Sequence, residues 1–470
     1  MTMLSLRAAA TLIPGASVLG DDTVSFDRVS IDSRAVGPGD LFVALKGERF
    51  DAHDFLEDVA SRHANAVMAS RSAGDGRLPV LRVADTRAAL GALARGWRQR
   101  FTLPLVAVTG SNGKTTVKEM LASIFAAHVG EAARLATEGN LNNDIGVPLT
   151  LLRLRSAHRL AVVELGMNHP GETQRLAQFA QPTVALVNNA QREHQEFMAT
   201  VKAVALEHAS VIHALPPEGI AVFPADDAHA GIWRAAAADN RNRVMDFALQ
   251  GAAGQNVNAA VTGRPSDKGL RIDTLQGRLD VALQALGAHN ARNALAATAA
   301  ALAAGVPLAA IGRGLEAFAP VQGRLQVKRA TLGALAGATV IDDTYNANPD
   351  SARAAIDVLA AQPAPRVLVM GDMGEVGDDG PMFHREAGTY ARERGIDALY
   401  ALGEATRDMV VAFGAKARHA AHENELVAAL MAANYGPAAT VLVKGSRFMQ
   451  MERVVEALTG TGLDVKSGAH

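Results

Sequence analysis

The chain has 470 residues, of which 49% are hydrophobic and 4% aromatic, with 46 basic and 48 acidic residues. This length predicts about three domains, and the net charge of −2 excludes a global field for nucleic acid, so any anion site must be local. The absence of cysteine excludes disulfides, thiolate catalysis and zinc–cysteine sites. The apolar run near the N-terminus is too short for a signal peptide, and no uncharged apolar run reaches membrane-spanning length, so we expect a cytoplasmic protein.

Residues 1–85 are expected to form a small mixed α/β domain of short strands and turns. A turn at 38–40 precedes a strand with alternating apolar positions at 41–45. Helical spacing at 84–100 then predicts a helix that bridges to the next domain.

Residues 86–319 alternate apolar runs with helical stretches, which is the pattern of a mostly parallel sheet covered by helices. Helices are predicted at 114–127 and 289–304, and a small antiparallel insertion at 255–285. The predicted strands lie at 105–108, 159–165, 183–189 and 219–223.

Residues 320–470 repeat the alternation and predict a second sheet, doubly wound and Rossmann-like. Its predicted strands lie at 338–342, 366–370, 397–402 and 439–443, each followed by a helical stretch.

The stretch GSNGKTT at 110–116 follows the first strand of the middle domain and opens a helix. Such a loop directs backbone N–H groups and a helix N-terminus at one point, which attracts phosphate. Lys114 can then reach the β- and γ-phosphates of ATP, and the Thr115 hydroxyl can bind Mg²⁺. The match is incomplete, because the usual first glycine of the motif would fall at Val108. The alternative is an ordinary strand–helix turn.

Three other stretches place polar residues where ligands bind in such sheets. Glu164 ends a strand and can hold Mg²⁺, or it is a solvated strand-end carboxylate. His194 follows the next strand and is either part of the same crevice or structural. Asn290 and Asn293 share one face at the start of a helix, where they can bind adenine or cap the helix.

With these stretches the chain resembles the Mur ligases, the ATP-dependent amide-forming family of peptidoglycan synthesis, over essentially its whole length. The shared motifs include TGSNGKTT at 109–116, HNARNALAA at 289–297, the pair at 323–324 and Asp343. Four further stretches point to one member of the family: 137–154, 164–172, 342–351 and 370–377. A DSR…PGDLF signature at 32–42 is shared with the member that adds the third residue of the peptide.

The resemblance implies an ATP-dependent ligase with three domains. The charge balance predicts no nucleic-acid partner, and because nothing in the sequence demands more than one copy, we expect a monomer. Its substrates would be UDP-N-acetylmuramoyl-tripeptide and D-alanyl-D-alanine. ATP would phosphorylate the terminal carboxylate of the tripeptide, and the amine of the dipeptide would attack the acyl phosphate. The N-terminal domain would bind the UDP-sugar, the central domain ATP, and the C-terminal domain the incoming dipeptide while closing over ATP, with Gly323 as a hinge element.

The resemblance also implies roles for individual residues. The catalytic set is Lys114, Glu164 and His194, with Thr115 and Glu164 binding one Mg²⁺ and His194 a second. The ATP contacts are Gly110, Ser111, Asn112, Gly113, Lys114, Thr115, Thr116, Asn290, Asn293, Arg324 and Asp343. The substrate contacts are Ser33 and Arg34 for the UDP-sugar, Asn140, Asn142 and Asn143 in the central cleft, and Tyr345, Asn346, Asn348 and Pro349 on the dipeptide side. Lys444, Ser446 and Arg447 either assist there or form a solvated strand end.

One position departs from the family pattern. Many Mur ligases carry a carbamylated lysine about fourteen residues beyond the position of His194, where it binds the second metal. This chain has His208 there, and Lys202 lies off the helical face that His208 occupies. Either His208 or Glu207 substitutes as a ligand, or water completes the shell. We therefore expect activity that does not depend on bicarbonate, and a carbamylated lysine found by mass spectrometry would contradict this.

Two alternatives remain open at this stage. The chain could be another amide ligase of the same family, such as the third-residue-adding enzyme or one that acts on a folate. It could also be a phosphate-loop ATPase that works as a conformational switch, or an inactive binding module. A switch would hydrolyse ATP without an amine acceptor and form no amide.

Overall fold

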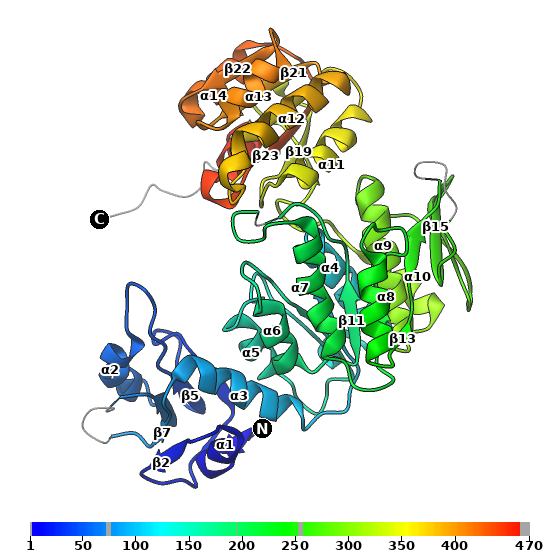
Figure 1. Cartoon of the computed structure of the whole chain (residues 1–470). Helices are drawn as coiled ribbons and strands as arrows, with labels where there is room; N and C mark the ends of the chain where they lie inside the picture. The colour runs from blue at the N-terminus through cyan, green and yellow to red at the C-terminus, as the bar shows by residue number, and fades with distance from the viewer. Residues whose placement is uncertain (1, 72–76, 194, 252–256, 461–470) are drawn as a thin grey trace.

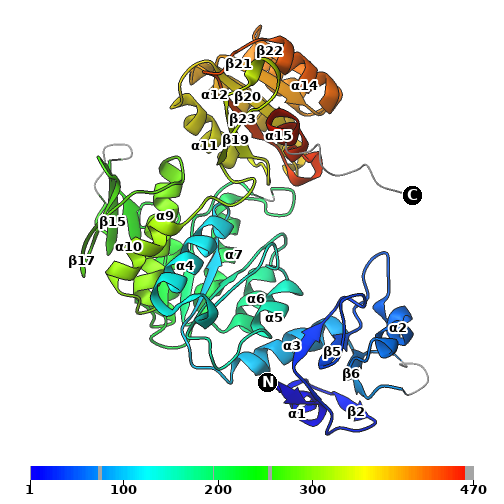
Figure 2. The ribbon, with the colours of Figure 1, turned by 180° about the vertical axis from the view of Figure 1, so that it is seen from behind.

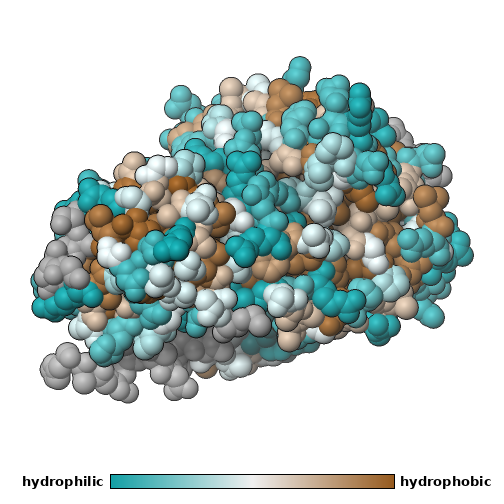
Figure 3. Space-filling model, turned by 90° about the horizontal axis from the view of Figure 1, so that it is seen from below, coloured by the Kyte–Doolittle hydropathy of each residue, from teal (hydrophilic) through white to brown (hydrophobic). Residues whose placement is uncertain are grey.

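The computed structural model describes residues 2–71, 77–193, 195–251 and 257–460. Three α/β domains follow one another along the chain, and both ribbon views place the first and the last at opposite ends of the middle one (Figure 1; Figure 2). No described helix has the length and apolar character needed to cross a lipid bilayer. Hydrophilic and hydrophobic side chains alternate over the face shown in Figure 3.

The N-terminal domain is built on a five-stranded sheet with strand order β2-β7-β6-β5-β4. Its β2–β7 pair is antiparallel and its other pairs are parallel. The predicted strand at 41–45 corresponds to β5, whose residues are all buried. Beside the sheet, β1 (Leu4–Ser5) pairs with β3 (Ser25–Phe26). The remaining elements are α1 (Leu6–Leu12), β2 (Ser17–Leu19), β4 (Arg28–Ser30), β5 (Asp40–Val43), α2 (Leu56–Ser61), β6 (Ala66–Ala69) and β7 (Val80–Arg82).

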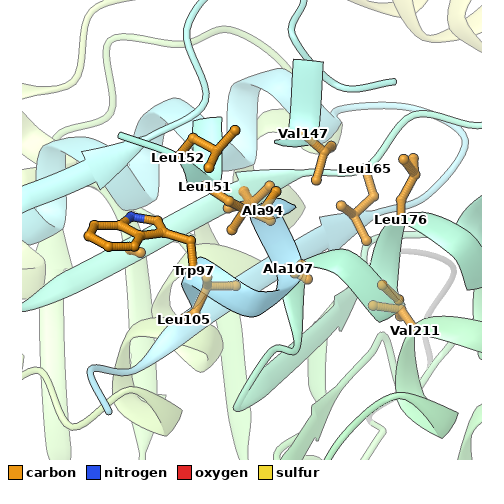
Figure 4. Close-up of a cluster of buried hydrophobic side chains, with 14 of the residues drawn as sticks. Ala94, Trp97, Leu105, Ala107, Val147, Leu151, Leu152, Leu165, Leu176 and Val211 are labelled. Carbon is orange, nitrogen blue, oxygen red and sulfur yellow. The ribbon is translucent and has the colours of Figure 1, made fainter. Parts of the chain in front are cut away.

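Helix α3 (Thr86–Arg98) joins the first two domains by packing rather than as a loose linker. It begins where the Asp85 side chain accepts hydrogen bonds from the backbone N–H groups of residues 87 and 88. Its apolar face enters a cluster that also includes residues of both neighbouring domains (Figure 4). Within that cluster Trp97 is 7% exposed, and its indole N–H donates to the Leu154 carbonyl at 3.1 Å. The two domains therefore share one hydrophobic core.

The central sheet has six parallel strands in the order β13-β12-β11-β8-β10-β9. Residues of β8 alternate between the faces, so Leu105 and Ala107 join one core and Val106 and Val108 the other. The strands are β8 (Leu105–Thr109), β9 (Arg134–Ala136), β10 (Leu160–Glu164), β11 (Val184–Val187), β12 (Ile220–Val222) and β13 (Arg243–Val244).

Helices cover both faces of this sheet, as predicted for a buried parallel sheet. One face packs against α4 (Lys114–Val129), α9 (Ala288–Ala303) and α10 (Leu308–Ala317). The other packs against α3, α5 (Gly146–Leu151), α6 (Glu172–Ala180), α7 (Val201–His213) and α8 (Ala230–Asp239).

The predicted insertion forms a separate four-stranded sheet at the edge of the central domain. It is antiparallel from β15 to β17, as expected, but β14 adds to it in parallel. Its strands are β14 (Phe247–Leu249), β15 (Val261–Ser266), β16 (Gly269–Thr274) and β17 (Gly277–Val281).

The C-terminal domain contains the second doubly wound sheet, with strand order β18-β19-β23-β20-β21-β22. Only the β18–β19 pair among these is antiparallel. Its elements are β18 (Gln326–Arg329), β19 (Thr339–Asp343), α11 (Pro349–Ala360), β20 (Arg366–Gly371), α12 (Gly380–Glu393), β21 (Ala398–Leu402), α13 (Thr406–Phe413), β22 (Ala417–Ala420), α14 (Glu423–Ala432), β23 (Thr440–Lys444) and α15 (Glu452–Thr459).

Candidate functional site: a phosphate-loop cleft between the domains

A cleft of about 1250 Å³ opens at the carboxyl ends of the central strands. Strand β8 lies there between β10 and β11, where the chain connections diverge to opposite sides of the sheet. Ligands of open α/β sheets bind at such a switch point. All three domains contribute to the walls, the N-terminal one through Glu48 and the C-terminal one through the loop after β19.

The glycine-rich loop between β8 and α4 forms the floor of this cleft. Gly113 has a φ of 80°, a left-handed conformation that favours glycine. A Cβ atom there would also lie 2.5 Å from the Asn293 Oδ1 and 2.7 Å from the Asn188 Nδ2. The loop therefore fits only without a side chain at Gly113, and α4 starts directly after it with its N-terminus facing the cleft. This is the arrangement of a phosphate site.

The Lys114 side chain is held by backbone carbonyls of the glycine-rich loop. Its ammonium donates to the carbonyls of Gly110 at 2.5 Å and Ser111 at 3.2 Å, and lies 3.5 Å from the Glu193 Oε2. The side chain is 16% exposed. The positive charge thus faces the cleft beside the amide-rich loop, where an anionic ligand would be neutralised.

Glu164 and Thr115 lie side by side where β10 ends and α4 begins. The Thr115 hydroxyl donates to the Glu164 Oε1 at 3.2 Å, and the Asn142 amide donates to the same oxygen at 2.8 Å. Glu164 is 2% exposed, so it is not a solvated strand-end carboxylate. Its Oε2 is buried and has no hydrogen-bond partner among the described residues.

An unpaired buried carboxylate oxygen is costly unless a cation or a donor meets it. Carboxylate and hydroxyl oxygens are the ligands that Mg²⁺ prefers. The donor set of Thr115 and Glu164 therefore fits a divalent cation next to the phosphate loop. No group of three or more acidic or histidine side chains arranged for a metal was found in the described part of the chain, so any such ion needs ligands from substrate or water.

Three asparagines form a connected amide cluster against the loop. Asn188, just after β11, donates to the Asn112 carbonyl at 2.7 Å and to the Asn293 Oδ1 at 2.9 Å. Asn293 in turn donates to the Asn290 Oδ1 at 3.0 Å, which confirms that the two share a face. Helix α9 has Gly287 as its N-cap with no side-chain cap, so helix capping does not explain these amides.

Arg324 brings the C-terminal domain into the cleft. Its guanidinium donates to the Thr115 hydroxyl at 2.9 Å and stacks over the Tyr345 ring at 4.1 Å. The Nε of Arg324 is buried without a partner among the described residues. Gly323 and Leu325 on either side have φ values of 71° and 54°, so the chain turns sharply at this junction.

Asp343 and Lys444 meet at the carboxyl ends of the neighbouring strands β19 and β23. The Lys444 ammonium lies 2.6 Å from the Asp343 Oδ2 and donates to the Asn346 carbonyl at 2.9 Å. Lys444 is 3% exposed, which contradicts the alternative of a solvated strand-end lysine. The other Asp343 oxygen accepts from the backbone N–H of Leu325 at 3.2 Å, which ties the inter-domain junction to the sheet.

The expected substrate residues divide into two groups. Asn142, Asn143, Tyr345, Asn346, Asn348 and Pro349 line the cleft, whereas Asn140, Ser33, Arg34, Ser446 and Arg447 do not. Arg34 is exposed and pairs with Asp32 at 2.9 Å, and this pairing lowers the pKa of Asp32 to about 2. The Asn143 Oδ1 accepts from the backbone N–H of Gly146, the first residue of α5, at 2.9 Å.

His194 lies outside the described residues, so its expected metal role stays a prediction. The two residues suggested to replace the carbamylated lysine, His208 and Glu207, lie against other protein groups. His208 is completely buried in α7, with Nδ1 3.0 Å from the Thr109 hydroxyl and Nε2 3.1 Å from the Glu193 Oε1. Glu207 instead accepts from the backbone N–H groups of Gly171 and Thr173 at the start of α6. Both therefore have structural partners already.

Several cleft residues were not predicted from the sequence. Arg192 and Glu193 follow β11 and meet side chains far away in the chain, and Gln191 exchanges hydrogen bonds with Ser111 and Asn112. The sequence feature that could have identified these residues is their position, since they lie in the same segment after β11 as His194. Their partners could not be read from spacing.

This fold and this cleft define a three-domain, phosphate-loop α/β protein whose third domain reaches into the site of the second. Family models match in the same order: "Mur ligase family, catalytic domain" at residues 25–98, "Mur ligase middle domain" at 108–301 and "Mur ligase, glutamate ligase domain" at 323–447.

The chain is similar to curated proteins along nearly its whole length. The UDP-N-acetylmuramoyl-tripeptide–D-alanyl-D-alanine ligase of Haemophilus influenzae is 38% identical over 450 residues, which cover 94% of this chain and 96% of the relative. The Escherichia coli protein of the same name is 40% identical over 442 residues, covering 93% and 95%. The chain belongs to the Mur ligase family.

Solved structures agree with this assignment. MurF from Acinetobacter baumannii matches with a TM-score of 0.88 and 34% identity, over 98% of this chain and 99% of that one. MurF from Thermotoga maritima in complex with ADP matches with a TM-score of 0.78 and 25% identity, over 92% and 97%.

Proposed function

We propose that the chain is an ATP-dependent ligase that joins D-alanyl-D-alanine to UDP-N-acetylmuramoyl-tripeptide, giving the pentapeptide precursor of peptidoglycan. The observation that carries this proposal is the similarity to two ligases of that specificity over 93–94% of the chain. The likeness extends through the third domain, which a simple phosphate-loop switch would not need.

The proposed chemistry explains why the cleft gathers positive and amide groups. The terminal carboxylate of the tripeptide is a poor electrophile, so its oxygen attacks the γ-phosphorus of ATP and ADP leaves. Two anions must approach for this step. Lys114 and the N-terminus of α4 would stabilise the charge that develops between them, because both are preorganised in a partly buried site.

The second step forms the amide. The dipeptide amine attacks the carbonyl carbon of the acyl phosphate, a C–N bond forms, phosphate leaves with the C–O bond electrons, and the amine loses a proton. Arg324, Asp343 and the amides of Asn346 and Asn348 would position nucleotide and dipeptide from the C-terminal side of the cleft.

We further propose that Thr115 and Glu164 hold a Mg²⁺ ion, and that His194 contributes to a second. A bound Mg²⁺ neutralises phosphate charge and so supports phosphoryl transfer. The support for the first ion is the unpartnered Glu164 Oε2 beside the Thr115 hydroxyl.

Each of the three domains has a proposed role in binding. We propose residues 1–85 as the UDP-sugar domain, 86–319 as the ATP domain, and 320–470 as the domain that binds the dipeptide and closes over ATP. Ser33 and Arg34 lie outside the cleft described here, so they would contact only a part of the substrate that extends along the N-terminal domain.

The decisive experiment is to incubate the protein with ATP, Mg²⁺, the UDP-linked tripeptide and D-alanyl-D-alanine, and to identify products by mass spectrometry. The proposal predicts a UDP-linked pentapeptide and one phosphate for each amide. Parallel reactions contain a UDP-linked dipeptide with a diamino acid, or a folate with glutamate. Product in either of these reactions alone would identify a different ligase of the family, and phosphate release without any amide would identify a switch.

A further inference from the structure

Arg192 connects the central domain to two helices of the C-terminal domain. Its guanidinium pairs with Asp350 at 2.7 Å and with Glu386 at 2.8 Å, and its backbone N–H donates to Asp350 at 2.8 Å. These partners lie 158 and 194 residues away, on α11 and α12. The same guanidinium stacks over the Phe383 ring at 5.4 Å.

The geometry of this contact is stronger than that of an ordinary surface ion pair. Arg192 donates to both oxygens of Asp350 and of Glu386, and forked arginine–carboxylate pairs of this kind combine strength with directional specificity. The three side chains are only 22–33% exposed, so solvent screens them less than an exposed pair. Arg353 shares Glu386 from within the C-terminal domain and thereby fixes the carboxylate.

The partners of Arg192 are attached to the phosphate loop by a second contact. Asn348, the N-cap of α11, donates from its side chain to the Asn112 Oδ1 at 2.9 Å, and Asp350 lies two residues further on. The start of α11 is therefore held to the central domain twice, by Asn112 from the loop and by Arg192 from the segment after β11. Arg192 and the junction at 323–325 both line the cleft, so the two domains also meet at a second place along its walls.

We propose that Arg192 is a positioning residue that holds the C-terminal domain closed against the phosphate loop, so that the acyl phosphate meets the dipeptide amine and not water. This inference rests on the proposed ligase function. Water attack on the same carbonyl carbon would return the tripeptide carboxylate and release phosphate without an amide. The structure thus assigns to Arg192 a role in coupling ATP use to amide formation.

The test compares phosphate released with pentapeptide formed in wild type and in Arg192→Met, which keeps an apolar stem over Phe383 but removes the charge. We expect the wild type to release one phosphate for each amide. In the variant we expect the phosphate-to-amide ratio and the KM for D-alanyl-D-alanine each to rise roughly 3- to 10-fold. Both should rise because the C-terminal domain, which would bind the dipeptide, is no longer held closed over the phosphate loop. Arg192→Lys should restore part of the coupling, because it keeps the charge.

Arg385→Met is the matched control. It removes an arginine from α12, the helix that carries Glu386, but the ion pair of Arg385 with Asp408 at 2.7 Å lies within the C-terminal domain. Its phosphate-to-amide ratio should stay at the wild-type value. Glu386→Gln removes the charge of the partner of Arg192 on the C-terminal domain and should reproduce the effect of Arg192→Met. The double variant should be no worse than either single variant.

An unchanged ratio and an unchanged dipeptide KM in both Arg192→Met and Glu386→Gln would overturn this inference alone. Absence of pentapeptide from the wild type would overturn the proposed function and the inference with it. A rise in the ratio for Arg385→Met equal to that of Arg192→Met would also overturn it, because the effect would then follow from the loss of any arginine charge.

Discussion

Lys114 is the residue on which the proposed chemistry depends most directly. Its ammonium is already held by two carbonyls of its own loop, so little reorganisation is needed when an anion arrives. No other described lysine except Lys444 lines the cleft, and Lys444 is bound to Asp343 in the next domain. A second lysine therefore cannot replace Lys114 from nearby.

Lys114→Ala should lower kcat by about 10²–10³-fold, the usual effect of removing one preorganised donor from a transition state. Pentapeptide formation under saturating substrates measures this, with circular dichroism to verify the fold. Lys202→Ala, which changes an exposed lysine, is the control and should retain full activity. A Lys114→Ala enzyme within a factor of a few of wild type would contradict the assignment.

At this scale the sequence predicted residues whose position in the chain fixes their place in the fold. Glu164, Asn290 and Asn293 end a parallel strand or open a helix, so the topology alone brings them to the crevice. The pairing of Arg192 with Asp350, or of His208 with Glu193, depends on how loops and domains meet. Neither pairing has a spacing rule, and both were missed. The bicarbonate independence expected from His208 stays a prediction.

Elements differed in how well the sequence revealed them. The buried strands β8, β10, β11, β19 and β20 are continuous apolar runs and were predicted to within about two residues, because burial on both faces of a parallel sheet leaves that signature. Short edge strands were missed. Both residues of β13 are exposed, and in β18 the half-buried positions hold the polar Gln326 and Lys328 while Val327 is exposed, so neither strand has a distinct hydrophobic pattern.

The phosphate loop makes a prediction about one glycine. Gly113→Ala should lower both Tm and nucleotide affinity. The alanine would have to adopt a left-handed φ, and its Cβ atom would also collide with the amides of Asn188 and Asn293. Conformational strain alone costs about 1–2 kcal/mol. Thermal unfolding with and without ADP measures both effects.

Gly130→Ala separates strain from collision. Gly130 ends the same helix at a φ of 89°, but a Cβ there meets nothing within 4 Å. Its variant should lose stability through strain only and keep its affinity for ADP. Equal losses of affinity in the two variants would show that the amide cluster does not shape the loop.

The whole molecule is joined differently at its two domain boundaries. Trp97→Ala should destabilise the N-terminal and central domains together by roughly 3–5 kcal/mol, since it empties a large site in their common core. Urea unfolding followed by fluorescence of the remaining Trp233 and by circular dichroism should show one shifted transition for both. Leu275→Ala, at a side chain 91% exposed, should leave the transition in place.

The second boundary depends on charge and therefore on pH. Hydrogen bonds from Arg192, more than its charge alone, hold the pKa of Glu386 below its ordinary value of 4.5, and Arg353 acts in the same direction. A lowered acid pKa means that the contribution of Glu386 is complete above 4.5 and is lost as the pH falls through the folded-state value.

Small-angle scattering at neutral and acidic pH should show the C-terminal domain held against the central domain at neutral pH and released from it on acidification. Glu386→Gln should show the released distribution already at neutral pH. A wild-type distribution of interatomic distances that stays unchanged as the pH falls well below 4.5, while the fold persists, would contradict the prediction.

The described side chains of the C-terminal domain form two hydrophobic clusters whose buried members begin at residue 325. In the N-terminal domain one cluster is local, but another continues through α3 into the central sheet. Severing the polypeptide near residue 85 would expose buried apolar side chains on both fragments, but severing it near residue 320 would divide none of the described clusters of buried side chains. The third domain is thus the natural unit for reassembly from separately made pieces, with Arg192 and Asn112 as the points at which it would dock again.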